Sequence, residues 1–211
     1  MQVKEKKVEM IELFYDLIYV YAISKMTKLI ETPKNGVIPL FEFFHYFVVC
    51  FVILQAWLYL TNYINRYGSW KWYEYGFTMI NMVATIYMVN TIQENWEVMA
   101  QPFNLSMLVM LLCVVALYLI QIFKKEQDIG AAKNILVNLS IICSLYCLAF
   151  IASFFQFSKI IFWMDTIAVL AGAFLPSIIR GNFDIQIISF PHLAERFELI
   201  TIITFGEGVV D

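Results

Sequence analysis

Residues 190–211 read FPHLAERFELITIITFGEGVVD, an apolar run that carries several ionisable side chains. Inside a membrane-spanning helix such groups are costly to bury, and where they occur they indicate function by default. Whether this run crosses a membrane therefore determines how the whole chain is interpreted. Its ionisable members are His192, Glu195, Arg196, Glu198 and Glu207.

The composition indicates an integral membrane protein. Apolar residues make up 61% of the chain and charged residues only 15%, whereas soluble domains are roughly 45–50% apolar and about 25% charged. A soluble chain of 211 residues has too little interior to hide this much apolar surface. The net charge of −3 and the lack of a basic tract argue against nucleic acid as a partner, and the lipid bilayer is the expected one.

Apolar stretches of about 20 residues suffice to cross a bilayer as helices. The sequence predicts an all-α, polytopic transmembrane bundle with six complete spans and a seventh in which the chain ends. Short connectors rich in turn-forming and charged residues separate the spans, among them 94–102 and 124–130. The predicted spans are 11–30, 38–64, 73–93, 104–123, 134–157, 160–179 and 191–211.

No connector is long enough to form a separate domain, so we expect one transmembrane domain over 1–211. A short internal similarity relates the segment 12–16, ELFYD, to the segment 195–198, ERFE. Six spans separate the two segments, so both enter the membrane from the same side, as a parallel repeat requires. A first six-helix repeat over 1–185, followed by the first helix of a second at 190–211, is therefore an alternative division.

The distribution of Lys and Arg predicts the orientation. Cytoplasmic loops carry an excess of these residues. If the N-terminus is inside, nine of them lie in cytoplasmic segments and four in outer segments. We therefore expect a multi-pass plasma-membrane protein with a cytoplasmic N-terminus, in which the polar ends of the first, second and last spans share one membrane face.

In the first span, Glu12 and Asp16 lie on one helical stripe. Acids in a first helical turn are favoured by the helix dipole, which explains Glu12 without a function. Asp16 lies about 6 Å deeper, so we expect it to be buried, functional or ion-paired.

The second span ends in a half-polar helix that contains Asn65 and Arg66. Amide side chains often join transmembrane helices, which is the structural interpretation of Asn65. Arg66 either extends to the cytoplasmic interface or pairs with Asp16. We expect Glu12 or Asp16 to lie within ion-pair distance of Arg66 or Arg196, because an unpaired charge in the membrane is costly.

In the last span, His192 and Arg196 lie on one side of the helix and Glu195 flanks them. Glu195 also suits the helix N-terminus, so a purely structural role remains open. Glu207 lies about 18 Å beyond Glu195 along the helix. It is flanked by two glycines, as at interrupted helices that bind ions in transporters. We expect Glu207 to be a protonatable site, with burial in a protein contact as the alternative.

Asp165, near the outer end of the sixth span, is either a helix-start residue or a functional acid. The chain has four cysteines and two histidines without metal-ligand spacing. No phosphate loop, dinucleotide fingerprint or nucleophile motif is present. We therefore expect no cofactor, no metal and no catalytic residues.

Several motifs together resemble the bacterial low temperature requirement A (LtrA) family. The first is E12-LFYD-L17, and the second is the Trp57, Thr61, Asn65, Arg66 and Tyr67 pattern. The strongest is H192-LAERFEL followed by G206-E-G208. Glu198 and Gly208 stand where the family has Gly and Ser. The family's members continue further, so we expect either a fragment or a truncated member, completed by missing C-terminal helices or by a homo-oligomer.

The resemblance implies a role in growth at low temperature or in stress adaptation, without a defined activity. The residues favour a secondary transporter or a proton or cation pathway. Asp16, Glu195 and Glu207 are its candidate ion sites, with Arg66 or Arg196 as counter-charges. One alternative is a membrane scaffold in which the same residues form structural ion pairs. A membrane-embedded enzyme is less favoured because no nucleophile is evident.

Overall fold

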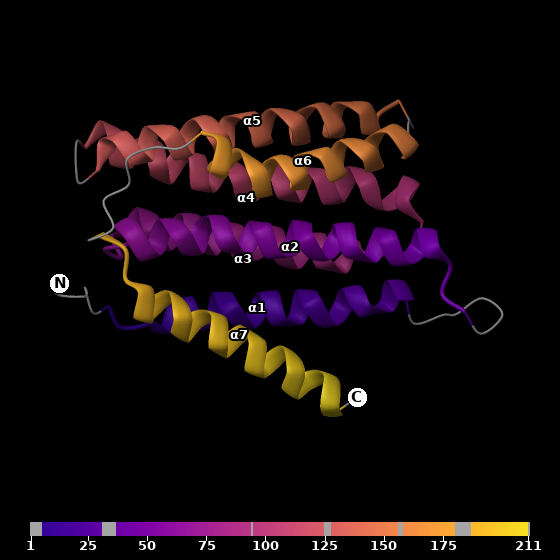
Figure 1. The fold of residues 1–211 in the computed structure, drawn as a ribbon, viewed down its shortest axis with the longest axis horizontal. Coiled ribbons are helices and arrows are strands. Elements are labelled where there is room, and N and C mark those ends of the chain that lie inside the picture. The colour runs from indigo at the N-terminus through magenta and orange to yellow at the C-terminus, as the bar shows by residue number, and fades with distance from the viewer. Residues whose placement is uncertain are drawn as a thin grey trace.

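The computed structural model is a bundle of long helices running along a common axis (Figure 1). It describes residues 6–30, 37–93, 95–124, 128–155, 158–179 and 187–210. The described residues form α1 (Met10–Met26), η1 (Thr27–Ile30, a 3-10 helix), α2 (Leu40–Tyr67), α3 (Trp72–Asn90), α4 (Trp96–Phe123), α5 (Ile129–Ser153), α6 (Ser158–Ile178) and α7 (Phe190–Val210). The predicted all-α, polytopic class is confirmed.

The helices form three groups in space. Helices α4, α5 and α6 pack on one another on one side of the bundle, α2 and α3 lie in the middle, and α1 and α7 lie on the other side (Figure 1). Helix α1 contacts α2, α3 and α7, whereas α2 contacts α4 and α6. Helix α7 diverges from the bundle towards its C-terminal end (Figure 1), so only its first half is positioned to contribute to the interior.

One end of the bundle gathers the start of α1, the α2–α3 turn, the end of α4 and the start of α7 (Figure 1). We call it the proximal end and the opposite end the distal end. The Lys6 ammonium donates to the Gly68 carbonyl at 3.0 Å, which satisfies a carbonyl at the α2 C-terminus. Glu74 accepts the Lys71 backbone N–H at 2.7 Å and so caps the start of α3.

Four helices in the described part of the chain are long and apolar enough to cross a membrane: α2, α4, α5 and α6, the last over Ile160–Ile178. Helix α1 is shorter, with 17 residues, and both α1 and α3 bury polar groups inside the bundle. In α3, for example, the Thr85 hydroxyl donates to Tyr19 at 3.2 Å, and Tyr19 donates to Asn81 at 3.3 Å. Such interhelical hydrogen bonds are a usual means of joining transmembrane helices.

Two predicted helix starts are wrong by more than a turn. Helix α4 begins at Trp96, not at residue 104, because the Asn95 side chain accepts the Glu97 N–H at 3.0 Å and caps an earlier start. Most of the predicted 94–102 connector is therefore helical, with Pro102 accommodated inside the helix. Helix α5 begins at Ile129, not at residue 134, because the Asp128 carboxylate caps it through the Ala131 N–H.

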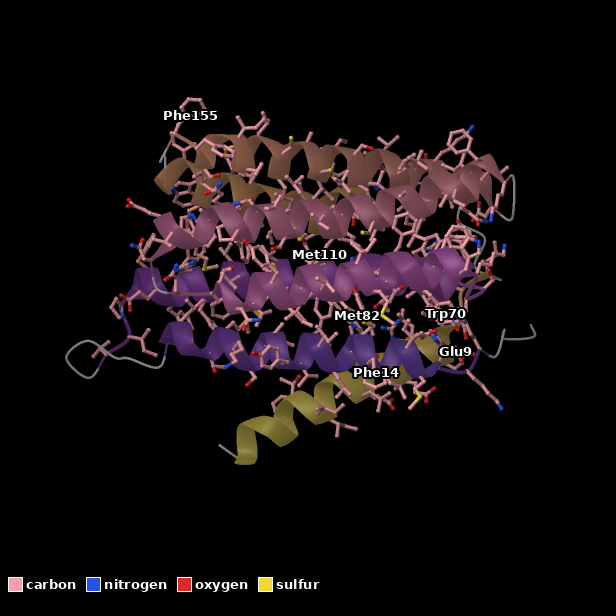
Figure 2. The ribbon with its side chains drawn as sticks, turned by 180° about the vertical axis from the view of Figure 1, so that it is seen from behind. Glu9, Phe14, Trp70, Met82, Met110 and Phe155 are labelled. Carbon is pink, nitrogen blue, oxygen red and sulfur yellow. The ribbon has the colours of Figure 1, made fainter. Side chains whose placement is uncertain are left out.

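Large apolar side chains cover the outside of the bundle as well as its core. Met82 and Met110 lie between helices with 6% and 1% of their surface exposed, whereas Phe14 is 56% exposed and Phe155 lies at the periphery (Figure 2). A soluble protein of this size rarely exposes so many large apolar groups. The surface of the bundle is thus suited to lipid.

Candidate functional site

The buried charges nearest the proximal end lie between α1 and α7. The Arg196 side chain is fully buried and donates twice to Asp16, from Nε to Oδ2 at 3.0 Å and from Nη2 to Oδ1 at 2.5 Å. Paired donation of this kind matches the planar guanidinium to a carboxylate. The Trp57 indole N–H from α2 also donates to Asp16 Oδ1 at 2.7 Å. Three N–H donors therefore converge on the Asp16 carboxylate.

Aromatic rings enclose the Arg196 guanidinium. Its Cζ lies 5.7 Å from the centre of the Tyr15 ring and 5.6 Å from that of Trp57. Ring faces attract a cation within about 6 Å, more strongly when water is excluded. Phe197 packs edge-on against Trp57 at 4.8 Å and covers the same site.

One turn nearer the proximal end, Glu12 and His192 form the second half of the arrangement. Glu12 is fully buried, and its Oε2 lies 2.6 Å from His192 Nε2 and 3.6 Å from Arg196 Nη1. Its Oε1 accepts the Trp70 indole N–H at 3.1 Å. Trp70 lies in the α2–α3 turn with φ 54°, a left-handed backbone conformation that non-glycine residues seldom adopt.

The neighbours of His192 define its tautomer. Asn65 accepts the Ser189 N–H at 3.2 Å and donates Nδ2–H to the Ser189 carbonyl at 2.8 Å, which fixes the orientation of its amide. The second hydrogen on Asn65 Nδ2 then points to His192 Nδ1 at 3.0 Å. An accepting Nδ1 carries no proton. His192 is therefore the neutral imidazole, and its Nε2–H donates to the Glu12 carboxylate.

We call these residues the α1–α7 cluster. In it, the carboxylates of Glu12 and Asp16 both face the Arg196 guanidinium. Nearly all hydrogen-bonding positions are satisfied, the exception being Arg196 Nη1. Removing one partner of a buried pair of this kind costs about 3–5 kcal/mol. The cluster consists of Glu12, Asp16, Trp57, Asn65, His192 and Arg196.

The expected contact between the first and last spans is present, and Arg196 makes it. Arg66 does not pair with Asp16: it lies one position from Asn65 on α2 and faces away from the cluster, into a cavity beside α5 and α6. Glu195 is exposed on α7 and lies outside the cluster. Glu207 falls in the last turns of α7, where side chains lie outside the described residues, so its role stays a prediction.

A second buried acid lies nearer the distal end. Asp165 in α6 is 0% exposed, and its Oδ2 accepts the Asn104 Nδ2–H of α4 at 3.2 Å. Asp165 Oδ1 has no hydrogen-bond partner within the described residues, and the same holds for Asn104 Oδ1 and the Tyr146 hydroxyl. Tyr146, in α5, lies within electrostatic range of Asp165. Three helices thus direct unpaired oxygens into one interior region, the Asp165 site.

Sequence reasoning identified Asp165 but missed its surroundings. Asn104 and Tyr146 lie in long apolar runs and show no motif. The available signal is polarity itself, because an amide or phenol on the buried face of an apolar helix needs a partner. Trp70 was also missed, because its role depends on the α2–α3 turn. No metal-binding group of three or more His, Cys, Asp or Glu residues occurs in the described ranges.

Fold and site together define a polytopic helical membrane protein with buried charges on facing helices. The chain belongs to the bacterial low temperature requirement A protein (LtrA) family, whose model matches residues 7–211. No curated protein and no solved structure matches the chain. The family assignment agrees with the E12-LFYD-L17 and H192-LAERFEL motifs, which supply Glu12, Asp16, His192 and Arg196 to the α1–α7 cluster.

Proposed function

We propose that this LtrA-family membrane protein is a secondary transporter or ion pathway in which Asp165 binds a proton or a monovalent cation. One observation carries the proposal. Asp165 is a fully buried carboxyl whose single hydrogen-bond partner in the described part of the chain is a neutral amide. Ionisable groups inside membrane proteins commonly mark ion pathways.

The chemistry of the Asp165 site favours a positively charged occupant. An ionised carboxylate and an amide oxygen only accept hydrogen bonds, so Asp165 Oδ1 and Asn104 Oδ1 both need a donor or a cation. The Tyr146 hydroxyl, which lies within electrostatic range of Asp165, donates a single hydrogen. An isolated buried carboxylate is unstable, and binding a proton or a desolvated cation removes that penalty.

The α1–α7 cluster has a different part in this proposal. Its carboxylates are already paired with Arg196, His192 and Trp57, so they hold α7 against α1 and leave little capacity for a transported ion. Glu195 and Glu207 remain candidate ion sites on α7. We place the proximal end in the cytoplasm of a plasma membrane, on the ground of the Lys and Arg distribution. A homo-oligomer is the proposed assembly.

Flux measurements test the ion pathway. The full chain is reconstituted into liposomes, and proton, Na⁺ and K⁺ movements are followed with ion-sensitive dyes under an imposed gradient. Asp165→Asn should abolish the flux that the wild type supports. The matched control is Glu97→Gln, an exposed acid in the first turn of α4. Equal flux from wild type and Asp165→Asn would contradict the proposal.

A membrane scaffold is the second candidate function. The near-complete pairing of the α1–α7 cluster favours it, because such pairing is typical of structural ion pairs. Wild-type protein that folds and inserts but moves none of the three ions would favour the scaffold. Both outcomes are read from the same vesicles, with orientation and protein content measured in each sample.

A further inference from the structure

A cavity of about 480 Å³ lies between α2, α5 and α6, with one residue of α4 at its side. It is separate from the α1–α7 cluster, because α2 presents a different face to each. The residues that line it come mainly from the proximal half of the bundle. They include Phe51, Leu54, Leu58, Asn62 and Arg66 on α2, Asn138 and Ile142 on α5, and Gly172, Ala173 and Pro176 on α6.

The cavity is long and narrow. Its α2 wall runs from Phe51 to Arg66, a distance of about 22 Å at 1.5 Å per residue. A volume of about 480 Å³ spread over that length suits an extended chain better than a compact solute. Phe51 at one end is 50% exposed, so this end of the cavity lies at the outer surface of the bundle.

Its polarity changes along this length. Among the described residues that line it, Arg66 is the only charged one, and it lies at the proximal end. Arg66 also has an interaction within the protein, but a guanidinium has five N–H donors and can bind more than one group. Asn62 follows one turn deeper, Tyr59 and Gln55 are polar side chains near the middle of the α2 wall, and Leu58, Leu54 and Phe51 are its apolar members.

An unpaired acceptor on α5 also lines the cavity. Asn138 is only 7% exposed, and its Oδ1 has no hydrogen-bond partner within the described residues. A buried amide oxygen without a partner costs about 1–3 kcal/mol. A hydroxyl group of a bound molecule would satisfy it.

The wall formed by α6 depends on a close helix contact. A Cβ at Gly172 would lie 2.3 Å from the Tyr59 hydroxyl and 2.7 Å from Gln55 Oε1. Gln55 Nε2 in turn donates to the Val169 carbonyl at 2.6 Å and joins α2 to α6. The cavity therefore has a fixed wall at this level and is not a gap between loosely packed helices.

We propose that this cavity binds an anionic amphiphile, with its acidic head at Arg66 and its apolar chain along Leu58, Leu54 and Phe51. The single cation at one end, the length of the α2 wall and the apolar residues towards the exposed Phe51 end all match such a molecule. A phospholipid with a hydroxylated headgroup and a free fatty acid share this chemistry. The inference goes beyond ion movement and needs no gradient for its test.

Native mass spectrometry of the full chain in detergent micelles measures binding directly. The probes are phosphatidylglycerol, dodecanoate and, as the zwitterionic comparison, phosphatidylcholine. One anionic probe should bind at a single site roughly tenfold more tightly than phosphatidylcholine, the loss expected when a charged hydrogen bond is absent. The tighter anionic probe identifies the source, lipid or free acid.

Variants place the site. Arg66→Gln should weaken binding of the anionic probe roughly tenfold. Lys133 is an exposed cation on α5 outside the cavity, so Lys133→Gln should leave this binding unchanged. Ala173→Trp should block binding by filling the cavity, whereas Phe174→Trp, 62% exposed and outside it, should not. Asn138→Leu gives a second, apolar substitution if the tryptophan variant misfolds, and it should weaken binding of the hydroxylated lipid.

Equal binding of all three probes, or equal effects of Arg66→Gln and Lys133→Gln, would overturn the proposal. If the protein moves no ions but still binds the anionic probe, the ion-pathway proposal is rejected and the amphiphile site stands.

Discussion

Arg196 of α7 donates two hydrogen bonds to Asp16 of α1, 180 residues away in the sequence. The Nε–Oδ2 distance is 3.0 Å and the Nη2–Oδ1 distance is 2.5 Å. Both side chains are at most 2% exposed. Helix α7 diverges from the bundle beyond this point (Figure 1), so this pair, the His192–Glu12 contact and the contacts of Asn65 and Trp57 with the first half of α7 attach it to the bundle.

Breaking the Arg196–Asp16 pair should destabilise the protein more than any surface change. Asp16→Asn leaves a buried guanidinium without its carboxylate, so the free energy of unfolding should fall by about 3–5 kcal/mol. Thermal unfolding in detergent measures the loss. Glu195→Gln on the same helix is exposed and should change stability by about 0.5 kcal/mol or less. Similar losses from the two variants would contradict the buried pair.

Asp165 should respond in the opposite way. No cation among the described residues pairs with it, so Asp165→Asn removes a buried ionisable group without leaving a buried countercharge. Stability at neutral pH should be unchanged or slightly raised, while Asp16→Asn is strongly destabilising. The two variants are compared in one unfolding series. A loss of about 3 kcal/mol for Asp165→Asn would reveal a cationic partner of this carboxyl.

His192 should be a neutral imidazole with its proton on Nε2. The reason is that Asn65, oriented by both backbone groups of Ser189, donates to Nδ1. Nitrogen-15 NMR of histidine-labelled protein distinguishes this tautomer from the imidazolium form at pH 7. His45 is the internal comparison, and Asn65→Ala should release the tautomer preference. Two protonated ring nitrogens on His192 in the wild type would contradict the assignment.

Two glycine substitutions should have effects of opposite sign. Gly172→Ala places a Cβ against Tyr59 and Gln55, so it should cost about 1–3 kcal/mol through overpacking. Gly76 is an exposed position of α3, and a Cβ added there would meet no atom within 4 Å. Gly76→Ala should therefore stabilise by about 0.4–1 kcal/mol, because alanine restricts the unfolded chain. Unfolding of both variants under one set of conditions checks the pair.

Labelling from outside intact cells should establish the proposed orientation. A single cysteine at Lys125, in the connector between α4 and α5, should not react with a membrane-impermeant reagent if the proximal end is cytoplasmic. A cysteine at Glu97, exposed near the distal end, should react. The reverse pattern would invert the proposed topology.

The sequence by itself determined the membrane class, the family and the approximate positions of the helices. Apolar runs of about 20 residues specify helices because the bilayer provides no partner for unpaired backbone groups. Periodicity also placed Glu12 with Asp16 and His192 with Arg196 on common helix faces. It was less accurate at the start of α4, where a side-chain cap at Asn95 decided the boundary.

Only the tertiary structure decided which charges meet. Arg66 and Arg196 were equal candidates for Asp16, and the crossing of α7 over α1 selected Arg196 while α2 turned Arg66 towards the cavity. Asp165 accepts a hydrogen bond from Asn104 and lies near Tyr146 only because α4, α5 and α6 pack together. The physical reason is that helical spacing fixes the face on which a residue lies, whereas its partner depends on which helix packs against that face.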